Sequence, residues 1–101
     1  MNIDTKMINE IINQHIKVAT NLISHSKTIE SICNITLDAL KNNKKVIFCG
    51  NGGSASDSIH IVAELVGRFE KDRIGLPALA LSSNTANITA IANDYGFEKI
   101  F

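Results

Sequence analysis

The sequence of 101 residues contains no tryptophan, a single proline and only two cysteines. Ten basic and ten acidic residues cancel, and no cluster of lysine and arginine offers the phosphate contacts that nucleic acid needs, so nucleic acid is excluded as the main ligand. No apolar run approaches the ~20 residues that cross a bilayer, and no secretory signal is visible. We therefore expect a cytoplasmic protein with no membrane partner.

The two cysteines, Cys33 and Cys49, have neither the spacing of a metal site nor that of a redox motif. They are predicted to be small buried hydrophobic residues in a reducing compartment. A hydrophobic content of 45% with 20% charged residues is typical of a globular domain.

Helical periodicity dominates the first part of the chain. Apolar residues recur every three or four positions over 4–24 and again over 28–40, with Asp4 or Thr5 as the candidate N-cap. Two successive helices predict a helical hairpin as the first domain, residues 1–44. Its apolar faces need a sheet or another copy of the chain to pack against.

The next segment predicts the beginning of an α/β domain. A strand over 45–49, apolar enough for burial on both faces, leads through a glycine-rich turn into a helix over 55–66. Ser54 is the expected N-cap, with Asp57 completing a capping box. Gly67 is the expected left-handed terminator of this helix.

A second strand over 78–81, the polar turn Ser82–Asn84 and a short helix over 85–92 follow, and residues 93–96 are expected to break that helix. Strand, helix and strand form a right-handed βαβ unit with parallel strands, so both polar turns lie beyond the carboxyl ends of the strands. Two strands cannot form a covered sheet. We therefore expect residues 45–101 to be the first half of a larger, truncated α/β domain, or to be completed by another chain.

The turn Gly50-Asn51-Gly52-Gly53-Ser54 directs backbone N–H groups and a helix N-terminus at one small volume, which attracts phosphate or another anion. Gly50, Gly52 and Ala55 match the dinucleotide pattern, but no acidic residue ends the next strand and no lysine stands at a P-loop position. A small phosphorylated ligand remains, with a turn needed only for strand–helix packing as the alternative. Asn51 and Ser54 are expected either to bond the ligand or to serve the turn and the cap.

His60 and Glu64 lie four residues apart and therefore on one face of the following helix. Such a pair supplies two metal ligands or a general acid and base, although this spacing also arises by chance. Asn93 and Asp94 are candidate ligand contacts if their turn folds back to the strand edge, and otherwise form the turn alone. Arg73, in the polar connection before the second strand, is expected to be solvated.

Three segments resemble those of one family: Phe48-Cys49-Gly50-Asn51-Gly52-Gly53-Ser54, His60 through Phe69, and Ala92-Asn93-Asp94-Tyr95-Gly96-Phe97. Over its whole length the sequence is similar to the bacterial phosphoheptose isomerases of the sugar isomerase (SIS) domain superfamily. The resemblance implies a fold of the α/β class, in which an N-terminal helical hairpin precedes the first βαβα of a SIS-type, flavodoxin-like three-layer parallel sheet.

This family converts sedoheptulose 7-phosphate to D-glycero-D-manno-heptose 7-phosphate, an aldose–ketose isomerisation through an enediol that supplies heptose for lipopolysaccharide or capsule. Its members are cytoplasmic homotetramers, and some bind zinc. The resemblance implies Glu64 as the catalytic acid/base and, in zinc-bound members, His60 and Glu64 as metal ligands. The residues implied to bind the phosphorylated heptose are Asn51, Gly52, Gly53, Ser54, Glu64, Asn93 and Asp94.

Family members are nearly twice as long as this sequence, and their phosphate loop rich in serine and threonine, a further metal-binding glutamine and a second catalytic histidine have no counterpart here. Two non-catalytic interpretations stay open. One is a SIS module that binds phosphosugars or acts like the related DnaA initiator-associating protein. The other is a remnant or scaffold that assembles through the N-terminal hairpin. The His60–Glu64 pair favours the enzyme.

Overall fold

The computed structural model describes residues 2–101, which form two compact units. The first unit extends to Ile35, and the second comprises Thr36–Phe101. Each unit is described by itself. Among residues 2–101, none of the helices has both the length and the hydropathy of a membrane-spanning segment.

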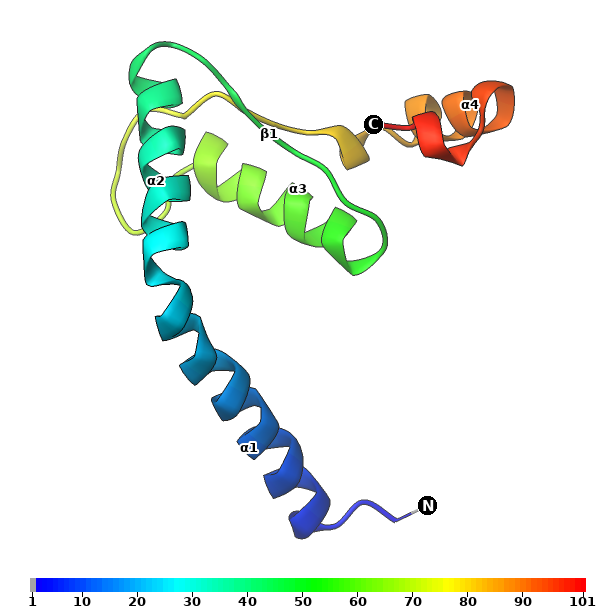
Figure 1. The fold of residues 1–101 in the computed structure, drawn as a ribbon. Helices are drawn as coiled ribbons and strands as arrows, with labels where there is room; N and C mark the ends of the chain where they lie inside the picture. The colour runs from blue at the N-terminus through cyan, green and yellow to red at the C-terminus, as the bar shows by residue number, and fades with distance from the viewer. Residues whose placement is uncertain (1) are drawn as a thin grey trace. The chain divides into compact units, whose positions relative to one another are not determined.

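The first unit is a nearly unbroken helical path (Figure 1, blue to cyan). Helix α1 (Thr5–Asn21) leads through the short 3₁₀ helix η1 (Leu22–His25) into α2 (Ser26–Lys41), whose last residues belong to the second unit. Asp4 caps α1, because its Oδ1 accepts a hydrogen bond of 2.8 Å from the N–H of Met7. One of the two predicted caps is thereby confirmed.

The predicted helical hairpin is wrong. The backbone is right-handed helical at Asn21, Leu22 and Ser26, so α1 and α2 run end to end (Figure 1). Residues 21–28 contain no glycine or proline, which are the residues that most readily reverse a chain. A tighter 3₁₀ turn therefore joins the helices without reversing their direction.

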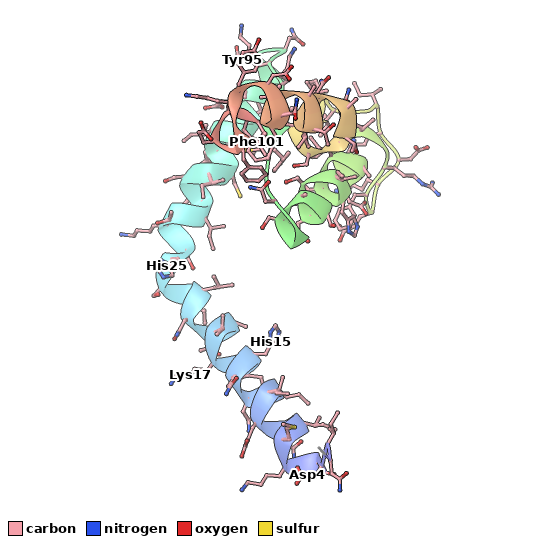
Figure 2. The ribbon with its side chains drawn as sticks, turned by 90° about the vertical axis from the view of Figure 1, so that its right-hand side faces the viewer. Asp4, His15, Lys17, His25, Tyr95 and Phe101 are labelled. Carbon is pink, nitrogen blue, oxygen red and sulfur yellow. The ribbon has the colours of Figure 1, made fainter. Side chains whose placement is uncertain are left out.

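The apolar stripe of α1 faces solvent in this chain. The helix has no buried residue, and Ile11 and Ile16 are 61% and 53% exposed. His15 and Lys17 project from opposite sides of the helix (Figure 2). The amphipathic pattern thus specifies the helix correctly, while its apolar face has no partner among the described residues of the first unit.

The second unit is built around a two-stranded parallel sheet. Strand β1 (Val46–Phe48) pairs with β2 (Ala78–Ala80) in the register Val46↔Ala78 and Phe48↔Ala80, and α3 (Gly53–Val66) packs along the strands (Figure 1). The predicted parallel βαβ arrangement is confirmed. The remaining elements are the 3₁₀ helix η2 (Leu81–Ser83), α4 (Thr85–Tyr95) and the 3₁₀ helix η3 (Phe97–Lys99).

Within residues 2–101, one face of the sheet is covered and the other is open. Side chains alternate between the faces of a strand, and Ile47 and Leu79, which are register partners, are 52% and 50% exposed. The predicted burial of the first strand on both faces is therefore wrong for the described residues, since α3 supplies the covering layer on one side alone. Cys33 and Cys49 are likewise exposed rather than buried.

The buried residues of this unit are few and lie near α3 and the chain end. Ala78 and Ile100 are the buried apolar residues of the described chain. The buried Ser58 of α3 satisfies its hydroxyl by donating to the carbonyl of Ser54 at 2.7 Å. Ala78 is the first residue of β2, which packs against α3, so this small core lies between the sheet and that helix.

Candidate functional site

The glycine-rich turn connects β1 directly to the first turn of α3. Gly52 occupies the N-cap position with a positive φ of 56°, and the helix begins at Gly53. Helix geometry leaves the earliest N–H groups without intrahelical acceptors, so those of Gly52 and Gly53 are available to an anion. Asn51, Gly52, Gly53 and Ser54 are all exposed.

Ser54 is not the N-cap, and Asp57 forms no capping box, contrary to the sequence-based expectation. Gly52 holds the cap position without a side-chain hydrogen bond, and Ser54 lies inside the first turn. Because glycine adopts a positive φ at little cost, the helix begins earlier than the serine predicts. At the other end, Gly67 terminates α3 as expected, but with a φ of −83° rather than in the left-handed region.

Two glycines of the turn are required for different reasons. A Cβ on Gly50 would lie 2.6 Å from the Cβ of Ser54, so a side chain there would push the start of α3 away. A Cβ on Gly52 would meet nothing within 4 Å, and only its positive φ favours glycine. Strand–helix packing therefore explains Gly50, whereas the backbone around Gly52 lies open to a ligand.

The two polar turns meet at the carboxyl edge of the sheet, as the topology predicts. The hydroxyl of Ser82 donates to the carbonyl of Gly50 at 2.7 Å and accepts from its N–H at 3.3 Å. Sequence reasoning missed Ser82 as an individual residue. The signal was its separation of 32 residues from Gly50, which equals the offset of the strand register.

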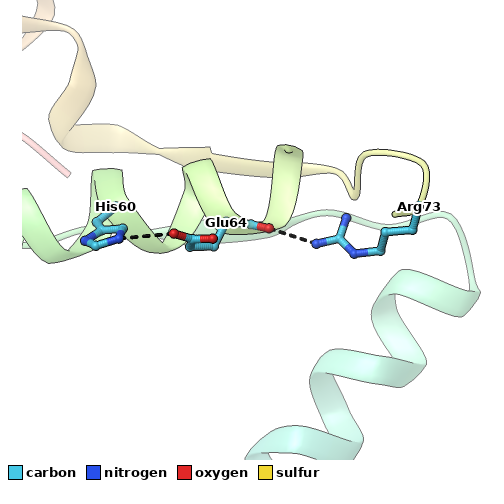
Figure 3. A network of polar contacts seen from close by, with 3 residues as sticks. All are labelled: His60, Glu64 and Arg73. Atoms are coloured by element: carbon cyan, nitrogen blue, oxygen red, sulfur yellow. Dashed lines mark hydrogen bonds and ion pairs between the residues drawn. The ribbon is translucent and has the colours of Figure 1, made fainter. Parts of the chain in front are cut away.

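His60 and Glu64 form a pair on α3 (Figure 3). His60 Nε2 lies 3.2 Å from Glu64 Oε1, and the two side chains are 76% and 41% exposed. The pair belongs to a shallow depression of about 300 Å³, which is lined by Asp57, His60, Ile61, Glu64 and Phe69. An exposed pair of this kind contributes little to stability, so the folded state does not require it.

Arg73 is not solvated as the sequence predicts. Its guanidinium donates to the carbonyls of Glu64, Leu65, Gly67 and Ile74 at 2.8, 2.9, 3.0 and 3.0 Å. Arginine presents several N–H donors in a fixed fork, which suits the acceptor-rich C-terminal end of a helix. Arg73 thus satisfies the end of α3 and holds the backbone of Glu64 in place (Figure 3).

Asn93 and Asp94 lie in the last turn of α4, not in a turn that ends it. The helix continues to Tyr95 and ends at Gly96, whose φ of 101° only glycine adopts readily. The Nδ2 of Asn93 donates to Asp94 Oδ1 at 3.0 Å. Both residues are exposed, and within residues 2–101 neither forms a hydrogen bond or ion pair with the glycine turn or with His60 and Glu64.

The donor set for a metal ion is incomplete within the described chain. His60 Nε2 and Glu64 Oε1 are 3.2 Å apart, a spacing that allows both atoms to bond one tetrahedral zinc ion at about 2.0–2.2 Å. No group of three histidine, cysteine or acidic side chains capable of holding a metal is found over residues 2–101. The pair therefore fits as part of a zinc site and not as the whole of one.

Comparison with known families matches residues 9–101 to the SIS domain model. The chain belongs to the SIS domain family. Among curated proteins, this SIS chain is 52% identical over 99 residues to a phosphoheptose isomerase of Geotalea daltonii, covering 94% of the chain and 52% of the relative. It is 50% identical over 95 residues to that of Nitratiruptor sp., covering 83% of the chain and 51% of the relative.

Solved structures agree with this assignment. A phosphoheptose isomerase from Francisella tularensis matches with a TM-score of 0.75 and 33% identity, over 91% of this SIS chain and 51% of the solved chain. The enzyme from Neisseria gonorrhoeae matches with a TM-score of 0.69 and 33% identity, over 93% and 50%. The SIS chain thus has the α/β fold of these isomerases and spans about half the length of the relatives that it matches.

Proposed function

We propose that this SIS chain binds sedoheptulose 7-phosphate and takes part in its isomerisation to D-glycero-D-manno-heptose 7-phosphate. The observation that carries the proposal is the arrangement of exposed polar groups along α3. Its first turn presents N–H groups at Gly52 and Gly53, and its exposed middle presents His60 paired with Glu64. Relatives about 50% identical to this chain are named phosphoheptose isomerases.

In this proposal Glu64 moves a proton between the carbonyl carbon of the sugar and the carbon next to it. Aldose–ketose isomerisation requires a base that removes a proton from one carbon and returns it to the next. Glu64 suits this task, because its carboxylate is accessible in the depression while Arg73 fixes its backbone. Asn51, Gly52, Gly53 and Ser54 bind the phosphosugar, and Asn93 and Asp94 are further substrate contacts.

His60 and Glu64 are also the proposed protein contribution to a zinc site. Zinc supplies Lewis-acid polarisation of the sugar carbonyl when it is bound. The 3.2 Å separation of the two donor atoms supports this assignment. Catalytic zinc sites have about three protein ligands. A further ligand must therefore come from outside the residues described.

We further propose that the chain acts in the cytoplasm, in heptose supply for lipopolysaccharide or capsule, as a homotetramer. The exposed apolar stripe of α1 supports self-association, since an amphipathic helix gains stability by burying that stripe against another. Sedimentation of the purified chain tests this assembly, and a monomer at all concentrations would contradict it.

The reaction is tested by deuterium incorporation. Incubation of the chain with sedoheptulose 7-phosphate in deuterium oxide should label the carbon next to the carbonyl, because a proton removed by Glu64 exchanges with solvent. Glu64→Gln should slow labelling at least about 100-fold, the typical contribution of a general base. Glu30→Gln on α2, an exposed carboxylate of the same length, is the matched control. Equal labelling by wild type and Glu64→Gln would reject the catalytic role of Glu64.

A non-catalytic phosphosugar-binding module is the second candidate. The incomplete metal donor set among residues 2–101 favours it. Calorimetric titration with sedoheptulose 7-phosphate, combined with the deuterium experiment, separates the two functions. Binding without deuterium incorporation would identify a binding module, whereas binding with incorporation identifies the isomerase.

A further inference from the structure

Beyond the last paired residues of β1 and β2, a side chain replaces the backbone as the hydrogen-bond partner. The register pairs Val46 with Ala78 and Phe48 with Ala80, so Gly50 would next pair with Ser82. The backbone of β2 cannot continue this pattern, because Leu81–Ser83 turns into a 3₁₀ helix. The Ser82 hydroxyl instead bonds both the carbonyl and the N–H of Gly50.

We infer that Ser82 is a positioning residue that holds the glycine-rich turn in its ligand-binding conformation. The inference rests on the proposed function, because it assigns Ser82 to the phosphosugar site at that turn. One small side chain fixes both hydrogen-bonding groups of Gly50. The donated bond of 2.7 Å has the ordinary length for a hydroxyl donor, while the accepted bond of 3.3 Å is longer.

The effect of Ser82 reaches the ligand-binding N–H groups through Gly50. On its other side, Gly50 lies against Ser54, where a Cβ would approach within 2.6 Å of the Ser54 side chain. Gly50 is thus held between Ser82 and the first turn of α3. Release of the Ser82 contacts would let the peptide groups of Asn51–Gly53 rotate, and an anion would then have to order them on binding.

Direct contact of Ser82 with a phosphate is a poorer explanation of this geometry. A serine hydroxyl has a single proton, and that of Ser82 is donated to the Gly50 carbonyl. A phosphate oxygen needs a donor, and Ser82 has none to spare while this bond persists. The residue is also half-buried, whereas the turn residues Asn51–Ser54 are exposed. Its role is therefore to position the turn.

The neighbouring Ser83 provides a matched control. Its hydroxyl donates at 2.7 Å to the carbonyl of Ala80, within its own 3₁₀ turn, and makes no described contact with Gly50. Ser82→Ala and Ser83→Ala remove the same atom from adjacent residues. Ser82→Thr keeps the hydroxyl and adds one methyl group, so it serves as the conservative rescue.

The experiment combines amide hydrogen exchange without ligand and calorimetric titration with sedoheptulose 7-phosphate. Loss of a hydrogen bond of ordinary strength predicts that Ser82→Ala speeds exchange at Gly50 by about tenfold and weakens binding by about tenfold. Ser83→Ala should change neither quantity, and Ser82→Thr should retain most of the affinity. Far-UV circular dichroism confirms that each variant is folded.

The outcomes separate this inference from the proposed function. Unchanged exchange at Gly50 in a folded Ser82→Ala would overturn the inference, as would unchanged affinity when wild type binds. If wild type binds no phosphosugar, the proposed function is rejected together with any role of Ser82 in binding, whatever the exchange data give. A loss of affinity restored by Ser82→Thr and absent in Ser83→Ala supports the inference.

Discussion

The two units of this SIS chain differ in the range over which their polar contacts act. In the first unit, the side chains of Asp4, Thr20, Ser24 and Ser26 bond backbone groups only three or four residues away. In the second, Ser82 reaches Gly50 across 32 residues and Arg73 reaches Glu64 across nine. The first unit is therefore specified by local sequence, while the site of the second depends on contacts between distant residues.

Gly50→Ala is expected to have the largest effect on stability and should break the second unit alone. The added methyl would lie 2.6 Å from Ser54 Cβ and 2.7 Å from its backbone, so either the turn or α3 must move. Overpacking of this kind costs about 1–3 kcal/mol of unfolding free energy. Urea denaturation, followed through the backbone amide signals of the second unit, measures this loss of unfolding free energy. Gly53→Ala, where a Cβ meets nothing within 4 Å, is the control and should be neutral or stabilising.

Arg73→Ala should have the next largest effect and should loosen the end of α3. It removes the donors to the carbonyls of Glu64, Leu65, Gly67 and Ile74. Charge-assisted hydrogen bonds contribute about 1.5–3 kcal/mol, and exposed acceptors regain part of that from water, so we expect a loss of about 2 kcal/mol. Arg68→Ala, an exposed neighbour, is the control. An equal loss of unfolding free energy in both variants would show that the contacts of Arg73 with α3 do not stabilise the protein.

Asp4→Ala tests the first unit, because its effect should stay within that unit. Loss of the bond to the N–H of Met7 removes an N-cap worth about 1 kcal/mol. Helicity measured by circular dichroism should fall, while amide exchange at Gly50 should not change. Asp4→Asn, which retains a capping oxygen, should restore the helicity. A change at Gly50 would mean that the units are coupled.

The His60–Glu64 pair should have the smallest effect on stability. Its side chains are 76% and 41% exposed, and exposed pairs contribute about 0–1 kcal/mol. A double-mutant cycle with His60→Ala and Glu64→Ala, followed by urea denaturation, should therefore give a coupling free energy below about 1 kcal/mol. A larger coupling would indicate a structural role and weaken the case for a functional one.

Topological rules predicted the most useful part of the site. A strand, a glycine turn, a helix and a second strand require parallel pairing, and parallel pairing brings Gly50–Ser54 and Ser82–Asn84 to one edge. The bond between Ser82 and Gly50 confirms that convergence. The i, i+4 spacing likewise placed His60 beside Glu64, because helical periodicity alone determines that contact.

The failures have local physical causes. The hairpin prediction assumed that the chain reverses between two successive helices, but the side chains of Ser24 and Ser26 bond helical carbonyls and so allow the helix to continue. The cap prediction preferred a serine over Gly52, whose positive φ cannot be deduced from residue type. Arg73 was missed because a long side chain selects its acceptors from the folded arrangement, which no sequence spacing reveals.

We propose that a single helix, α3, binds the phosphosugar both at the glycine turn and at the His60–Glu64 pair. The direct test of this proposal is a nuclear magnetic resonance titration that follows the amides of Gly52 and Gly53 and the imidazole of His60. With sedoheptulose 7-phosphate, all three should shift along one binding curve, whereas inorganic phosphate should shift the glycine amides and leave His60 unchanged. No shift at the glycine turn, or separate curves for the turn and for His60, would contradict the account.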